Sequence, residues 1–75
     1  MTELPDELMA SEIKTAEGKY PSQIVLRQVK PSTFATHIKV HPPDRETYFI
    51  LGHYFTKREE AEIDFYKRVR DLDGP

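Results

Sequence analysis

The clearest signal of the fold is in residues 34–41, which read Phe34-Ala35-Thr36-His37-Ile38-Lys39-Val40-His41. In a β-strand, successive side chains point to opposite faces of the sheet. One face therefore takes Phe34, Thr36, Ile38 and Val40, and the other takes Ala35, His37, Lys39 and His41. This alternation predicts a strand with one face packed against a core.

Two further strands are predicted on either side of this stretch. Residues Gln23–Lys30 are rich in β-branched and apolar side chains, and Pro31-Ser32-Thr33 forms a turn after them. A second turn is predicted over Pro42–Glu46, because proline has no backbone N–H to donate to a neighbouring strand. The third strand is predicted over Thr47–Phe55. The short connections favour an antiparallel meander.

A helix is predicted after the third strand. Thr56 is a suitable N-cap residue and Glu59 completes a capping box. Its apolar side chains recur at helical spacing, at Ala61, Phe65, Val69 and Leu72, and Gly74-Pro75 ends it. We therefore expect an α+β fold of order β-β-β-α, a three-stranded antiparallel sheet with the C-terminal helix packed on one face.

The first part of the chain is harder to assign. Residues 1–22 are acidic, and Leu8, Met9 and Ile13 form only a thin apolar stripe. Isolated helices of this length are marginal in water. We expect residues 1–22 to be a flexible or partly helical segment, in which a short helix from about Pro5 to Thr15 is one alternative, and residues 23–73 to be the β-β-β-α domain.

Composition narrows the classes of function. The 75 residues carry a formal charge of −2 and contain no cysteine, so disulfides, thiolate nucleophiles and cysteine-ligated zinc are excluded. No apolar stretch approaches the ~20 residues that span a bilayer. The acidic start, Met1–Glu7, does not resemble a secretory signal. We expect a soluble protein of a reducing compartment, the bacterial cytoplasm, without a membrane partner.

The polar residues do not form a catalytic or metal-binding pattern. His37 and His41 share a strand face, but four residues of strand separate them by about 13 Å, too far for one metal ion. The serines lie in the N-terminal segment or in turns, and the three glycines do not cluster. We expect no enzyme activity, no metal and no cofactor.

The aromatic residues are the more informative group. Four tyrosines and four phenylalanines exceed what one sheet face can bury. If Phe49 and Leu51 face the helix, then Tyr48, Ile50 and Tyr54 lie on the open face beside His37 and Lys39, forming an aromatic and mildly basic surface. Two alternatives remain. Leu4, Leu8, Met9 and Ile13 could cover that face, and a one-residue slip of the third strand would exchange its faces.

Three segments resemble the DNA-binding domain of plant ethylene-response factors: Phe34–Lys39, Tyr48–Tyr54 and Thr56–Ala61. The resemblance implies three antiparallel strands with a packing helix, and DNA contact through the opposite sheet face. Arg27 and Lys39 match arginines of that family that contact DNA, and Ile50 matches a DNA-facing tryptophan. At other arginine positions this chain has Ile24, Val29 and Tyr48.

Two weaker resemblances concern the helix start and the third strand. Thr56-Lys57-Arg58, followed by Ala61, is similar to the helix start of double-stranded-RNA-binding domains, but Glu59, Glu60 and Glu62 would repel phosphates. The end of the third strand, Gly52–Phe55, resembles that of small uncharacterised bacterial proteins.

The sequence thus predicts a small non-enzymatic module for protein interaction or self-association, which acts through the open sheet face. Its partner would be another protein or a second copy. The predicted binding residues are Arg27, His37, Lys39, Tyr48, Ile50 and Tyr54. The alternative is a weak nucleic-acid-binding domain that uses the same face, which the pI near 5.9 disfavours.

Overall fold

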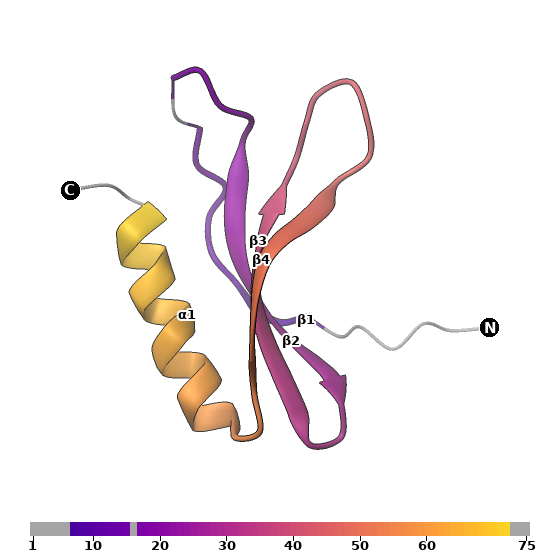
Figure 1. Ribbon diagram of the computed structural model, residues 1–75. Coiled ribbons are helices and arrows are strands. Elements are labelled where there is room, and N and C mark those ends of the chain that lie inside the picture. Colours follow the sequence, from indigo (N-terminus) through magenta and orange to yellow (C-terminus); the bar gives the residue numbers. More distant parts are fainter. Residues whose placement is uncertain (1–6, 16, 73–75) are drawn as a thin grey trace.

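The computed structural model describes residues 7–15 and 17–72. An antiparallel sheet of order β1-β2-β3-β4 has one helix, α1, lying along one face (Figure 1). Its elements are β1 (Glu7–Ala10), β2 (Ser22–Lys30), β3 (Thr33–Val40), β4 (Tyr48–Phe55) and α1 (Arg58–Leu72). The predicted α+β class, the antiparallel meander and the C-terminal helix are confirmed.

The prediction of three strands is wrong, and so is the alternative of a short N-terminal helix, because residues Glu7–Ala10 form a fourth strand. β1 pairs antiparallel with β2, with Met9 opposite Leu26 and Ala10 opposite Val25. Ser11 extends the pairing: its N–H donates to the Ile24 carbonyl at 2.8 Å, and its hydroxyl accepts from the Ile24 N–H at 2.9 Å. A strand here satisfies backbone groups along β2 that a short helix would have left unpaired.

The core lies between the sheet and α1. Ile24 and Leu26 of β2 are buried against Ala61 and Phe65 of the helix. Partly buried side chains pack around this cluster: Leu8, Met9, Phe34, Ile38, Phe55, Val69 and Leu72. The predicted helix stripe and the inward positions of Phe34 and Ile38 are confirmed. Leu4, Pro5, Gly74 and Pro75, which other predictions used, lie outside the described residues.

The helix starts slightly later than its sequence signal predicts. Its first residue is Arg58, and the Ala61 N–H donates to the Lys57 carbonyl at 3.2 Å. Lys57 therefore takes the N-cap position that the sequence assigned to Thr56.

A β-bulge in β4 decides which side chains share a face. Ile50 lies opposite Ile38 and His53 lies opposite Thr36, so Leu51 and Gly52 together stand opposite the single residue His37. Leu51 has a φ of 54°, in the left-handed region that residues with a Cβ rarely adopt. The bulge shifts the alternation of the strand by one residue.

As a result, the predicted faces of β4 are wrong over its first half. Tyr48 and Ile50 pair with Val40 and Ile38, and therefore lie on the helix side of the sheet. Phe49 pairs with Lys39 and lies on the open face, the side away from α1. Beyond the bulge, Tyr54 pairs with Ala35 and reaches the open face as predicted.

Candidate functional site

Four of the six predicted binding residues share the open face, namely Arg27, His37, Lys39 and Tyr54. The other two, Tyr48 and Ile50, lie on the helix side. Sequence reasoning missed Phe49, although a glycine inside an apolar strand is a known sign of a bulge and could have pointed to it. All four of these β4 residues belong to a strand at the margin of the sheet: Tyr48, Phe49, Ile50 and Tyr54.

Phe49 is the centre of the cluster on the open face. The Arg27 guanidinium lies 4.6 Å from its ring centroid and the Lys39 ammonium lies 5.8 Å away, both within cation–π range. The Lys39 ammonium also contacts a Glu7 carboxylate oxygen at 2.9 Å. This acid, supplied by β1, offsets part of the positive charge that the sequence predicted for the surface.

His37 is buried between β4 side chains although it lies on the open face. Only 7% of the residue is exposed; its ring lies 5.4 Å from Phe49 and 5.7 Å from Tyr54, centroid to centroid. Burial lowers the pKa of His37, and the nearby positive charges of Arg27, Arg68 and His53 lower it further. His37 is therefore a neutral packing residue at pH 7, with its ring against the bulge.

Gly52 gives the His37 ring its space. A Cβ at position 52 would lie 2.5 Å from His37 Nε2 and 3.2 Å from Tyr54 Cε1. Any side chain at this position must therefore displace a buried ring.

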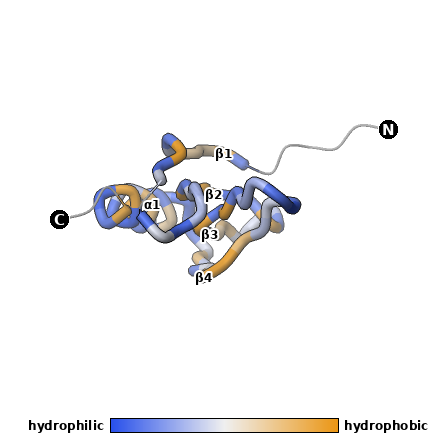
Figure 2. Tube along the Cα trace, turned by 90° about the horizontal axis from the view of Figure 1, so that it is seen from above, coloured by the Kyte–Doolittle hydropathy of each residue, from blue (hydrophilic) through white to orange (hydrophobic). Residues whose placement is uncertain are grey.

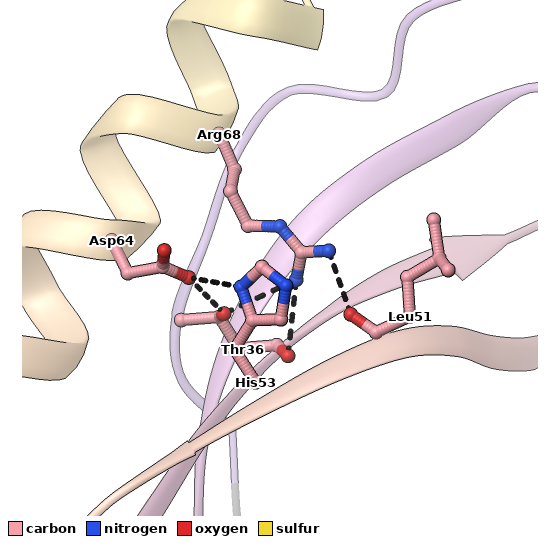
Figure 3. A network of polar contacts seen from close by, with 5 residues as sticks. All are labelled: Thr36, Leu51, His53, Asp64 and Arg68. Atoms are coloured by element: carbon pink, nitrogen blue, oxygen red, sulfur yellow. Dashed lines mark hydrogen bonds and ion pairs between the residues drawn. The ribbon is translucent and has the colours of Figure 1, made fainter.

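A polar network joins α1 to the other face of the bulge (Figure 3). The Thr36 hydroxyl donates to Asp64 Oδ2 at 2.5 Å, and His53 Nδ1 lies 3.1 Å from the same oxygen. Arg68 donates to the Thr36 carbonyl at 3.2 Å and to the Leu51 carbonyl at 2.6 Å. The helix thus holds the left-handed residue of the bulge by its carbonyl.

Asp64 is ionised within this network. Burial acts to raise its pKa, but the hydrogen bonds from Thr36 and His53 and the positive charges of His53 and Arg68 outweigh it, so the pKa of Asp64 is lowered. Thr36 is fully buried and its hydroxyl is already bonded to the carboxylate. The arrangement is that of a structural anchor, with the hydroxyl unavailable as a nucleophile.

β4 is the most exposed apolar part of the sheet. Its eight residues contain no lysine, arginine or acidic side chain, and seven of them are exposed. The exposed residues lie on both faces: Tyr48 and Ile50 on the helix side are each 40% exposed, and Phe49 and Tyr54 on the open face are 38% and 63% exposed. Figure 2 shows β1 and β4 at opposite margins, with hydrophobic residues along β4. Strands with apolar side chains on both faces are normally interior strands.

The helix side of this margin is hollowed. Tyr48, Ile50 and Val40 line an open groove of about 640 Å³, together with Tyr20 and Lys19 from the β1–β2 connection. The apolar surface along β4 therefore continues past the area that α1 covers.

Residues 7–15 and 17–72 contain neither a cluster of metal ligands nor a membrane-spanning helix. No three histidine or acidic side chains there come together in a group that could hold a metal ion. The only helix of that part of the chain is too short and too polar to cross a bilayer.

Comparisons with known proteins give no match to any family model, curated protein or solved structure. The resemblance to the ethylene-response-factor domain therefore stays a prediction.

The fit between Gly52 and His37 can be tested by a double-mutant cycle. Gly52→Ala should lower the free energy of unfolding by about 1–3 kcal/mol, the usual cost of overpacking. In a His37→Ala background the same substitution should cost much less, because the ring that it displaces is gone. Chemical denaturation of the four proteins measures this coupling, and equal costs in both backgrounds would contradict it.

His37 should also make stability depend on pH. Its pKa is lowered in the folded chain from an ordinary value of 6.5, so the unfolded chain binds this proton at higher pH. The contribution to stability is present above pH 6.5 and is lost as pH falls toward the lowered value. The thermal unfolding temperature of His37→Gln should therefore change less than that of wild type between about pH 7.5 and about pH 5. Parallel curves for the two proteins would refute this assignment.

Proposed function

We propose that this chain is a non-enzymatic protein-interaction module that binds an extended segment of a partner along the outer edge of β4. The supporting observation is that a strand with apolar residues on both faces stands at the margin of the sheet, with seven of its eight residues exposed. An edge strand presents backbone donors and acceptors to a further strand, which is how many domains capture extended peptides.

The two margins of the sheet differ in a way that selects β4. β1 has four residues and carries Glu7, which is ion-paired to Lys39. Short length and charge are common means of keeping an edge from pairing. β4 is twice as long and contains no lysine, arginine, acidic residue or proline, so its bulge is the main feature of the strand that would oppose pairing.

The side chains on β4 would supply the affinity. A strand added outside β4 would cover Phe49 and Tyr54 on one face and Tyr48 and Ile50 on the other. Buried aromatic side chains dominate the energetics of interfaces, since each removes about 150–250 Å² from water. The cation–π contacts of Arg27 and Lys39 hold the Phe49 ring on the open face, where the added strand would cover it.

The nucleic-acid alternative would use the open face instead, with bases stacked on Phe49 and Tyr54. The cations above Phe49 support it, whereas the Glu7 carboxylate at Lys39 opposes it. Such binding would weaken steeply with added salt.

Peptide display tests the proposal. Random peptides selected on the monomeric chain should protect β4 amides from hydrogen exchange when they bind. Leu51→Lys should weaken their binding by about tenfold or more, or about 1.4 kcal/mol. Ile63→Lys is the matched control, since Leu51 and Ile63 are 64% and 69% exposed and Ile63 lies on α1.

Two results would overturn the proposal. One is that selected peptides bind equally well to Leu51→Lys and to wild type. The other is that no peptide protects β4, while a single-stranded oligonucleotide binds with strong salt dependence and shifts the signals of Arg27 and Phe49.

A further inference from the structure

We infer that the strand received by β4 is β4 of a second copy of this chain, so that two sheets join edge to edge about a twofold axis. This inference rests on the proposed function and names its partner. Three features of β4 support it: the position of the bulge, the distribution of charge and the pairing of aromatic residues.

The bulge favours a partner with the same irregularity. A regular strand can pair along the whole of β4 only if one of its residues stands opposite both Leu51 and Gly52. His37 of β3 has this position on the other edge of β4. A second β4, running antiparallel and centred on the bulge, pairs residue for residue. Leu51 of one copy then stands opposite Gly52 of the other.

In this register the faces match on both sides of the bulge. Ile50 meets His53 of the other copy, and both residues lie on the helix side. Phe49 meets Tyr54 of the other copy, and both lie on the open face. In a strand of regular alternation these residue pairs would lie on opposite faces, because their positions differ by odd numbers. The bulge therefore makes the strand complementary to its own copy.

Charge points to the same partner. A twofold axis brings residues near it close to their own copies, so a charge there would meet a like charge. β4 carries no lysine, arginine or acidic residue in its eight positions. The first charges beyond its two ends, Glu46 and Lys57, have opposite signs, and an antiparallel pairing brings the end with Glu46 toward the end with Lys57 of the other copy.

The next residues outward, Arg45 in the β3–β4 connection and Arg58 at the start of α1, are like charges, but each already has an acid in its own chain. Arg45 contacts Asp44 at 3.5 Å and Arg58 contacts Glu62 at 2.8 Å. The ends of the paired region are therefore not dominated by repulsion.

The self-paired strand also places aromatic rings together. Phe49 would lie beside Tyr54 of the other copy on the open face, and Tyr48 beside Phe55 on the helix side, each pair occurring twice by symmetry. Aromatic cross-strand pairs are among the stabilising neighbours in antiparallel sheets.

Sedimentation equilibrium over a concentration series tests the association. Wild type should show a monomer–dimer equilibrium, and Leu51→Lys should raise the dissociation constant by about tenfold or more, because it places two lysines beside the axis. Ile63→Lys should leave the constant unchanged. Circular dichroism checks folding, and Tyr54→Lys, at a site 63% exposed, serves as a second edge variant if Leu51→Lys does not fold.

Cysteine cross-linking tests the register, because the chain has no cysteine of its own. An oxidised mixture of Ile50→Cys and His53→Cys should form the mixed disulfide dimer. A mixture of Ile50→Cys and Tyr54→Cys should not, because these side chains would lie on opposite faces.

The outcomes separate the inference from the proposed function. A wild-type chain that stays monomeric at all concentrations overturns the inference, while β4-protecting peptides in the same chain would still support the proposed function. A dimer that tolerates Leu51→Lys and Tyr54→Lys as well as Ile63→Lys overturns the β4 interface. A dimer that forms the Ile50–Tyr54 disulfide instead overturns the register.

Discussion

The close approach of Gly52 to the buried ring of His37 determines the path of β4 and the surface that this strand presents. Because β4 uses two residues, Leu51 and Gly52, against one residue of β3, its side chains change faces halfway along. A Cβ at position 52 would meet the imidazole at 2.5 Å, so only glycine allows the ring to pack there. The exposed apolar side chains on both faces of β4 follow from this local geometry.

The helix α1 stabilises the same bulge from the other face of the sheet. Arg68 bonds the carbonyl of Leu51, whose φ of 54° costs roughly 1–2 kcal/mol for a residue with a Cβ. Hydrogen bonds to charged groups contribute about 1.5–3 kcal/mol each, which is enough to offset that cost. Thr36 and Asp64 fix the helix beside Arg68, so the packing of α1 and the shape of the β4 edge depend on each other.

The sequence predicts those parts of the fold in which one spacing of apolar side chains continues through a whole strand or helix. The alternation from Phe34 to Val40 and the helical spacing of Ala61, Phe65, Val69 and Leu72 both survive in the structure. The strand β1 was missed because the adjacent apolar residues Leu8 and Met9 fit one turn of helix as well as a short strand. Tyr48 and Ile50 were assigned to the wrong face because a bulge formed by a leucine in the left-handed region leaves no periodic signal.

The bulge can be measured directly by NMR, through cross-strand contacts between backbone protons of β3 and β4. With the bulge in place, we expect contacts of Ile50 with Ile38 and of His53 with Thr36 in the same sample, with Leu51 and Gly52 both opposite His37. Contacts that continue in one unbroken register from Ile50, with Gly52 opposite Thr36, would show that β4 has no bulge. In that case the side chains of β4 would alternate regularly between the two faces, and the strand would not be complementary to its own copy.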